Sequence, residues 1–273
     1  MSKNKKGKEI PHIGGPIVET HCHLDFLKEE TIEEILKKSH EYGIDKVVTI
    51  AVNKDNLSIV RDIANKYSNV YCTQGIHPHN AKDWSKELEK TLIYNLKTKN
   101  QKTVAVGEIG LDYHYNNSPK ENQIEAFERQ IELATEFNLP VVIHSRDAEE
   151  DTKKILTSYS TNLQKKGVIH SFTSKMDLAE KALDSGFYLG FNGIITFNSA
   201  TEVREVVKRC PLERILVETD SPFLTPTPFR GNENAPYYLP LVIKKIAEIK
   251  NVDIDLVIKT TTKNAFDLFS FPG

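Results

Sequence analysis

Short apolar segments alternate with longer amphipathic segments along most of the chain. Each short segment has the length of a buried strand, and several are apolar without alternation, which is typical of parallel strands covered on both faces. The pattern predicts eight strands, at residues 16–19, 46–52, 70–74, 103–108, 140–144, 167–170, 187–191 and 214–218.

The amphipathic segments between these strands have helical spacing. In residues 31–42, for example, Ile32, Ile35 and Leu36 fall on one face, and Gly43 follows as a natural helix end. The predicted helices are 31–42, 56–67, 86–97, 119–137, 148–159, 175–184 and 200–208, with two final helices at 237–249 and 253–269. The segment 221–240 is rich in Pro and Asn and is predicted to be a long loop.

Eight strands alternating with helices predict a single (β/α)8 TIM-type barrel. An open doubly wound sheet is the structural alternative. No G-x-G-x-x-G or P-loop pattern follows a predicted strand, which weakens the nucleotide-binding version of that alternative. We expect the barrel to occupy residues 16–273 and the lysine-containing residues 1–15 to form a flexible basic tail.

Composition narrows the class of protein further. The chain has 273 residues and a net charge of −2, whereas a protein that coats DNA without sequence preference is normally basic. Its three cysteines, Cys22, Cys72 and Cys210, are scattered and show no C-x-x-C spacing, so a disulfide framework is not expected. No run approaches the ~20 apolar residues of a membrane span. These features predict a cytoplasmic protein with no membrane contact and no obligatory protein partner.

Metal-binding residue types recur where the predicted strands end. In a barrel all these ends meet at the carboxyl-terminal mouth, where the active sites of this fold lie. A lone histidine at a strand end is more often structural, but burying so many ionisable groups without partners would be costly. A metal site at the mouth accounts for all of them together. The candidate ligands are His21, His23, Glu108, His144, His170 and Asp220.

The number of candidate ligands favours two metal ions. Six ligands are too many for one tetrahedral site with an open position, but they suit two ions that share a bridging carboxylate. Glu108 is the natural bridge, since it comes from the middle of the barrel order. Imidazole and carboxylate ligands suit Zn²⁺ and Mn²⁺, and Mg²⁺ is also compatible with them.

Several longer motifs resemble the TatD family of metal-dependent deoxyribonucleases, in the amidohydrolase-like superfamily. The resemblance covers nearly the whole chain from residue 16 onward. It rests on Thr20-His-Cys-His-Leu-Asp, Gly75-Ile-His-Pro-His, Val106-Gly-Glu-Ile-Gly-Leu-Asp-Tyr, Pro140-Val-Val-Ile-His-Ser-Arg, His170-Ser-Phe-Thr and Glu218-Thr-Asp-Ser-Pro-Phe-Leu-Thr-Pro. One departure is Ser174, which stands where the family often has glycine.

The resemblance implies a barrel that hydrolyses DNA with two divalent ions, as a 3′–5′ exonuclease or as a broader DNA hydrolase. It implies that His21, His23, Glu108 and Asp220 hold one ion, and that Glu108, His144 and His170 hold the other. The substrate would be DNA, as single strands or 3′ ends, with RNA as a further candidate.

Further residues near the predicted mouth are candidates for binding substrate. His77 resembles a family position near the scissile phosphate, and Arg146 could pair with a phosphate or with Asp147. Tyr113, like Phe172 and Phe223, could stack on a base or pack within the protein. His79 is expected to be structural. Asp112 and Glu218 are expected to orient ligand histidines.

The preferred hypothesis is hydrolysis of a phosphodiester by a metal-activated water, with Glu108 and Asp220 as catalytic residues and Asp220 accepting the proton of the water. Hydrolysis of an amide, ester or lactone is the alternative, but one-metal enzymes of that type often carry a carboxylated lysine where this chain has Glu108. A non-catalytic binding module with a structural metal is the third reading. Its weakness is that the ligand set is complete and keeps open coordination.

Overall fold

The computed structural model describes residues 9–97 and 102–271. Eight strands form one parallel sheet in sequential order, with each strand paired to the next along the chain. The strands are β1 (Ile17–Cys22), β2 (Ile44–Thr49), β3 (Val70–Gln74), β4 (Thr103–Asp112), β5 (Val141–Arg146), β6 (Gly167–Ile169), β7 (Tyr188–Phe191) and β8 (Ile215–Val217).

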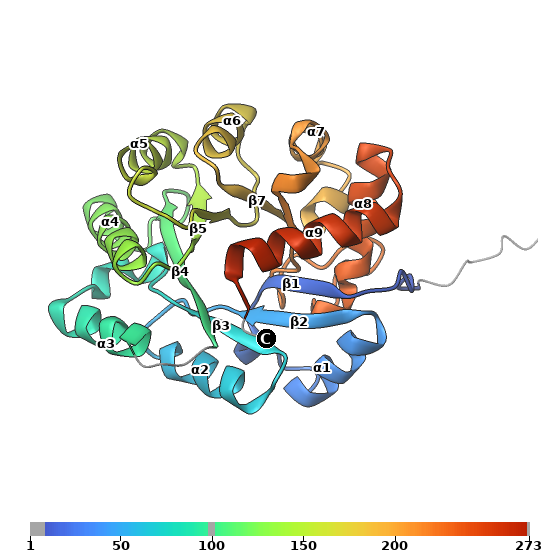
Figure 1. The fold of residues 1–273 in the computed structure, drawn as a ribbon, viewed down its shortest axis with the longest axis horizontal. Coiled ribbons are helices and arrows are strands. Elements are labelled where there is room, and N and C mark those ends of the chain that lie inside the picture. Colours follow the sequence, from blue (N-terminus) through green and yellow to red (C-terminus); the bar gives the residue numbers. More distant parts are fainter. Residues whose placement is uncertain (1–8, 98–101, 272–273) are drawn as a thin grey trace, which may run out of the picture.

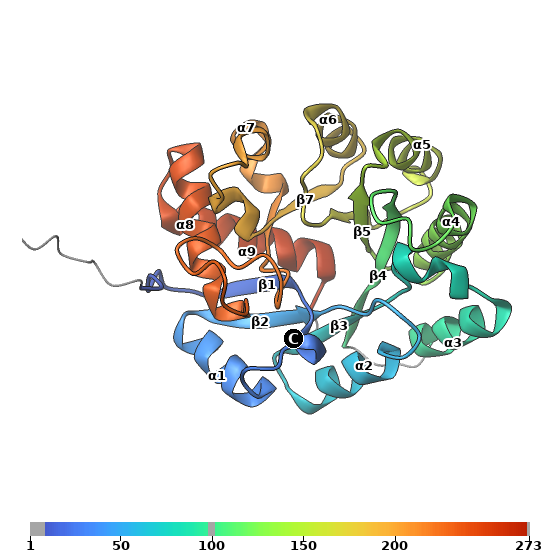
Figure 2. The same ribbon diagram turned by 180° about the vertical axis from the view of Figure 1, so that it is seen from behind.

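Helices surround this sheet, as Figures 1 and 2 show from opposite sides. The α-helices are α1 (Ile32–Glu41), α2 (Leu57–Lys66), α3 (Lys86–Lys97), α4 (Lys120–Glu136), α5 (Glu149–Tyr159), α6 (Met176–Asp184), α7 (Thr201–Arg209), α8 (Leu239–Lys250) and α9 (Ile254–Phe269). Short 3₁₀ helices are η1 (Leu24–Phe26), η2 (Pro78–Asp83), η3 (Gly193–Thr196), η4 (Leu212–Arg214) and η5 (Pro236–Tyr238). The arrangement confirms the predicted (β/α)8 barrel.

The first and last strands meet at a seam near the mouth of the barrel. The backbone N–H of Asp220 donates to the carbonyl of His21 at 2.9 Å, and the N–H of His23 donates to the carbonyl of Ser221 at 2.8 Å. These bonds join the segments that follow β8 and end β1. Two sets of predicted metal-binding residues, far apart in sequence, are therefore fixed next to each other by the closure of the barrel.

Apolar side chains fill the barrel and cover its amino-terminal end. Residues from the strands pack against Ala265, Leu268 and Phe269 of α9 and against Phe271. The strand residues of this cluster include Val18, Val48, Tyr71, Val104, Val142, Val168, Tyr188 and Leu216. Figure 1 shows α9 crossing this end of the barrel, so the opposite, carboxyl-terminal end is the one open to substrate.

Local signals account for several helix boundaries. Thr31 and Glu34 form a reciprocal capping box at the start of α1, which satisfies two backbone N–H groups that lack helical partners. After α1 the chain reverses at Gly43, whose φ of +86° agrees with the predicted helix end. Among the helices of residues 9–97 and 102–271, none combines the length and apolarity needed to cross a membrane.

Three strands were predicted to end too early. We expected strands to end at Glu19, Glu108 and His144, but β1, β4 and β5 continue beyond them. The ladder between β4 and β5 continues as far as Asp112 and Arg146. The polar side chain of His144 contacts those of Glu108 and Asp112 inside the barrel. Their polarity therefore does not interrupt the backbone pairing of β4 with β5. Residues 1–8 of the expected basic tail lie outside the described residues.

Gly110 provides a test of how tightly β4 and β5 approach each other. Its φ is +134°, and a Cβ atom there would lie 2.0 Å from the carbonyl oxygen of His144. We expect Gly110→Ala to lower the free energy of unfolding by roughly 2–5 kcal/mol, because backbone strain and a backbone clash add. Urea-induced unfolding followed by circular dichroism measures this loss.

Gly14→Ala is the matched control. Gly14 also has a positive φ, +82°, but a Cβ atom there would meet nothing within 4 Å. Only the backbone penalty of about 1 kcal/mol should remain. Equal losses in the two variants would contradict a close-packing role for Gly110.

Candidate active site

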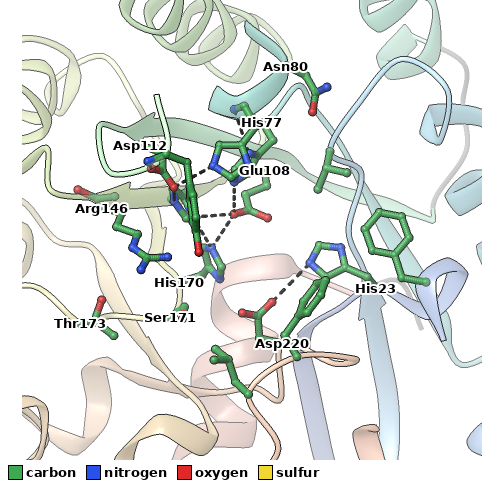
Figure 3. A pocket seen from close by; sticks show the side chains of 18 of the residues that line it. His23, His77, Asn80, Glu108, Asp112, Arg146, His170, Ser171, Thr173 and Asp220 are labelled. Atoms are coloured by element: carbon green, nitrogen blue, oxygen red, sulfur yellow. Dashed lines mark hydrogen bonds and ion pairs between the residues drawn. The ribbon is translucent and has the colours of Figure 1, made fainter. Parts of the chain in front are cut away.

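A cavity of about 800 Å³ opens at the carboxyl-terminal mouth (Figure 3). Five of the six predicted metal-binding residues line it: His23, Glu108, His144, His170 and Asp220. The sixth, His21, is fully buried and lies against Glu108 and Asp220. The fold thus gathers residues from β1, β4, β5 and from the segments after β6 and β8 around one space.

Glu108 lies at the centre of this group. Its Oε1 atom is 2.7 Å from Nε2 of His170, 3.1 Å from Nδ1 of His144 and 3.2 Å from Nε2 of His77. Its Oε2 atom is 3.4 Å from Nε2 of His21. The register between β4 and β5 shifts between Gly107 and Ile109, so Glu108 sits at an irregularity in the ladder. One carboxylate therefore faces imidazoles with both oxygens.

Asp220 makes similar contacts with His21, which lies in β1, and with His23, which follows β1. Its Oδ1 atom lies 3.4 Å from Nε2 of His23 and 3.6 Å from Nε2 of His21. Asp220 has a φ of +58°, in the left-handed region, which aspartate tolerates better than most residues. This turn directs the carboxylate back toward the end of β1.

These separations match the spacing of atoms around a metal ion. Ligand atoms about 2.0–2.1 Å from a tetrahedral ion lie about 3.3 Å from one another. The separations of 3.4 and 3.6 Å that link His21, His23, Glu108 and Asp220 are close to this value. His144 Nδ1 and His170 Nε2, 3.4 Å apart and both close to Glu108 Oε1, form a second such group.

Unpartnered ring nitrogens give further support for a bound cation. Both ring nitrogens of His21 are buried and make no hydrogen bond within the described part of the chain. Leaving such atoms without a partner is unfavourable, and coordination to a metal removes the penalty at the nitrogen that faces the carboxylates. The residues present therefore fit divalent metal.

Hydrogen bonds of His144 and His77 indicate which ring nitrogen of each carries the proton. Nε2 of His144 lies 2.9 Å from Oδ2 of Asp112, so an Nε2–H donor there leaves the lone pair of Nδ1 facing Glu108. In His77, Nδ1 accepts from the backbone N–H of His79 at 3.1 Å. Neutral His77 then carries its proton on Nε2, which makes it a donor rather than a ligand.

The pKa values follow the same arrangement. Burial alone would raise the pKa of Glu108, but His170, His77 and His144 outweigh it and hold that pKa well below its usual range. Burial lowers the pKa of His77 to about 4, against the opposing effect of Glu108. His77 is therefore neutral at physiological pH, in agreement with its role as an N–H donor.

Glu19 is a buried acid that sequence reasoning did not select. Its Oε1 atom accepts from the backbone N–H groups of His21, at 3.1 Å, and Thr219, at 2.9 Å. Burial raises its pKa to about 8, although these hydrogen bonds oppose the shift. Glu19 lies two residues before His21, on the same strand, and this spacing was the available signal. Through these two hydrogen bonds, the side chain of Glu19 joins the backbone of β1 at His21 to the segment after β8 that carries Asp220.

The predicted substrate-binding residues separate into two groups. His77 and Arg146 line the cavity. The guanidinium of Arg146 lies 4.8 Å from the ring centroid of Tyr115, and Asp147, the expected alternative partner, pairs with His114. The hydroxyl of Tyr113 donates to Asp151, and the tyrosine that lines the cavity is Tyr115. A strand that continues to Asp112 places Tyr115, rather than Tyr113, at the rim.

Other expectations near the mouth have mixed outcomes. His79, expected to be structural, lines the cavity and lies 3.0 Å from Asp112, which also contacts His144. Glu218 lies 3.6 Å from Nδ1 of His170 and accepts the backbone N–H of Ser171. Phe223 lines the cavity, whereas Phe172 is buried against Phe191. Ser174 is also buried, and its neighbours Ser171 and Thr173 line the cavity.

Comparison with known proteins establishes the class of protein to which this chain belongs. The chain is 38% identical over 254 residues to the metal-dependent hydrolase YabD of Bacillus subtilis (strain 168), a match that covers 93% of this chain and 98% of that protein. With the cluster of histidine and carboxylate side chains at the barrel mouth, this similarity identifies the protein as a metal-dependent hydrolase.

The particular family follows from a second comparison. The sequence model of the family described as "TatD related DNase" matches residues 18–270, and the chain belongs to this family. The structure of YjjV, a TatD homologue from Escherichia coli K12, superposes with a TM-score of 0.89 at 30% identity, over 94% of this chain and 99% of that one. The 3′-5′ ssDNA/RNA exonuclease TatD of Erwinia amylovora is 34% identical over 87% of this chain and 93% of its own.

Asp112 allows a test of the support behind His144, one of the predicted metal ligands. We expect Asp112→Asn to weaken divalent metal binding about 10- to 100-fold, because His144 loses the carboxylate that orients its ring. Isothermal titration of metal-free protein with Mn²⁺ measures the affinity. Asp147→Asn is the matched control, since Asp147 is exposed and, among the residues that the structure describes, forms an ion pair only with the exposed His114. A similar loss in both variants, or in neither, would contradict this role.

Proposed function

We propose that this protein hydrolyses phosphodiester bonds of DNA, as a 3′–5′ exonuclease on single strands or 3′ ends, with RNA as a further substrate. In the proposed site, His21, His23, Glu108 and Asp220 hold one divalent ion, and Glu108, His144 and His170 hold a second. The observation that carries the proposal is the position of Glu108, whose Oε1 atom faces His144 and His170 while its Oε2 atom faces His21.

Bound divalent ions would neutralise phosphate charge and lower the pKa of a water molecule, which supplies the nucleophile near neutral pH. Asp220 lines the cavity and keeps 13% of its side chain exposed, so its carboxylate is accessible to that water. We assign to Asp220 the acceptance of the proton of the water. The water oxygen then bonds to phosphorus as the bond between phosphorus and the 3′ oxygen of the leaving strand breaks.

Two donors at the mouth favour a phosphate over a carbonyl group as the reacting centre. The side chain of Arg146 makes no hydrogen bond or ion pair within residues 9–97 and 102–271, so its planar guanidinium is available to an anion. His77 presents an Nε2–H group beside Glu108. Together they would bind non-bridging oxygens of a phosphodiester that the ions already hold.

The choice of nucleic acid rests on the family and on one relative. The family is described as DNases, and the relative from Erwinia amylovora is described as a 3′-5′ exonuclease of single-stranded DNA and RNA. The alternative, hydrolysis of a small amide, ester or lactone, requires no positive group at the position of Arg146. Assays of 4-nitrophenyl acetate and a dipeptide beside the oligonucleotide separate these substrate classes.

Glu108→Gln tests the proposed site. The full chain, stripped with a chelator and reloaded with Mn²⁺, should shorten a 5′-labelled single-stranded oligonucleotide progressively from its 3′ end. We expect Glu108→Gln to lose at least about 100-fold in kcat/KM, because removal of a shared ligand should cost more than removal of an outer partner. Gel analysis of the products gives the rate, and elemental analysis gives the metal content.

Glu125→Gln is the control, since Glu125 is exposed on α4, away from the cavity. It should retain wild-type activity and metal content. If Glu108→Gln lost metal but kept full activity, the catalytic assignment would be wrong. If wild-type protein cleaved the carbonyl substrates and no phosphodiester, the alternative function would replace the proposed one.

A further inference from the structure

Two aromatic rings at the mouth of the cavity are exposed. Tyr115 is 55% exposed and Phe223 is 52% exposed, and both line the cavity. Of the large hydrophobic side chains that are exposed in the described part of the chain, these are the two that line it. Because exposed aromatic surface is unfavourable in water, its placement beside a substrate cavity points to a bound apolar or aromatic group.

Tyr115 is held in place on the β4 side of the mouth. Its backbone N–H donates to Oδ1 of Asp112 at 3.0 Å. The guanidinium of Arg146 lies over its ring, and the rings of His79 and His114 approach it nearly at right angles. More than half of the residue nevertheless remains exposed. The ring is thus oriented before any substrate arrives.

Phe223 is held in a comparable way on the β8 side. Its backbone N–H donates to the carbonyl of Asp220 at 2.9 Å, and its own carbonyl accepts from the side-chain amide of Asn234 at 2.5 Å. Its ring lies 6.1 Å from the ring of His23, at an angle of 66°. Phe223 therefore stands beside the proposed metal ligands and keeps an exposed ring.

The two rings lie on opposite sides of the proposed metal cluster. Tyr115 follows β4 and Phe223 follows β8, and these strands are four apart in an eight-stranded barrel. Figure 3 shows their neighbours Arg146 and His23 on opposite sides of Glu108. A phosphodiester held at Glu108 has one nucleoside on each of its sides, so each nucleoside would extend toward one ring.

We propose that Tyr115 and Phe223 stack on the two bases that flank the scissile phosphate, one ring for each base. The inference rests on the proposed phosphodiesterase function and adds which two side chains would contact the unpaired bases. Every base has an aromatic face, so such stacking is tolerant of sequence. In a duplex both faces of the penultimate base are covered by the neighbouring base pairs, and a ring has no access to them.

The experiment combines removal of a ring with removal of a base. The Mn²⁺-loaded full chain is given three 5′-labelled single strands: an intact strand, one whose 3′-terminal residue lacks its base, and one whose penultimate residue lacks it. Tetrahydrofuran residues provide the baseless positions. The variants are Tyr115→Ala, Phe223→Ala, the ring-retaining Tyr115→Phe and Phe223→Tyr, and Tyr94→Ala as a control on the exposed face of α3.

We expect each alanine variant to lose about 5- to 100-fold in kcat/KM on the intact strand, as base stacking on an aromatic side chain predicts. On the strand that lacks the base contacted by its own ring, the variant should match wild-type protein. Tyr115→Ala and Phe223→Ala should respond to different baseless positions. Tyr115→Phe, Phe223→Tyr and Tyr94→Ala should resemble wild-type protein on every strand.

Three results would overturn this inference while leaving the proposed function intact. The alanine variants could lose nothing on the intact strand, or lose equally on all three strands, or both respond to the same baseless position. Failure of the proposed function looks different. Wild-type protein would then cleave none of the strands and would not cleave bis(4-nitrophenyl) phosphate either.

Discussion

The active site depends on a buried carboxylate surrounded by imidazoles. Glu108 is almost inaccessible to water, and the charge of a carboxylate in such a place is costly unless it is matched. Four imidazoles compensate for this cost, because each places a ring nitrogen within 3.4 Å of one of the carboxylate oxygens. They belong to His21, His77, His144 and His170. Removal of this carboxylate would leave several buried imidazoles without the charge that determines their protonation and orientation.

The same feature links the fold to the chemistry. The seam between β1 and β8 is closed by backbone bonds of His21, His23 and Asp220, which are also the proposed ligands of one ion. Glu19 adds a buried carboxyl group that accepts backbone N–H groups from both sides of the seam. A substitution that weakens the seam would therefore move the proposed ligands as well as the strands. Substitutions there would change the stability of the fold and the geometry of the proposed metal site together.

Much of this arrangement was predictable from the sequence. Apolar periodicity gave all eight strands and their order, and the residue types at the mouth pointed to a common cluster around Glu108. The residue motifs also pointed to the family that the comparisons establish. These signals are local and follow from burial on both faces of each strand, which is why they can be read from a single sequence.

What was missed depends on contacts between distant segments. No local pattern shows that β4 continues to Asp112, because this requires its pairing with Arg146 of β5. The choice between Tyr113 and Tyr115 at the rim follows from that extension. The partner of Arg146 was equally undetermined, since Asp147 is its neighbour in sequence but pairs with His114. Propensity and spacing describe single elements, whereas these outcomes are set by the register between elements.

Asp112 connects the metal ligands with the proposed recognition of bases. Its Oδ2 atom contacts His144 and His79, while its Oδ1 atom accepts the backbone N–H groups of His114 and Tyr115. One buried carboxylate thus orients a proposed metal ligand and anchors the ring that would receive a base. Because both depend on the same side chain, a phosphate held at the ions and a base stacked on Tyr115 would be positioned relative to each other by the protein itself. This shared support needs no broad basic surface, in agreement with the net charge of −2.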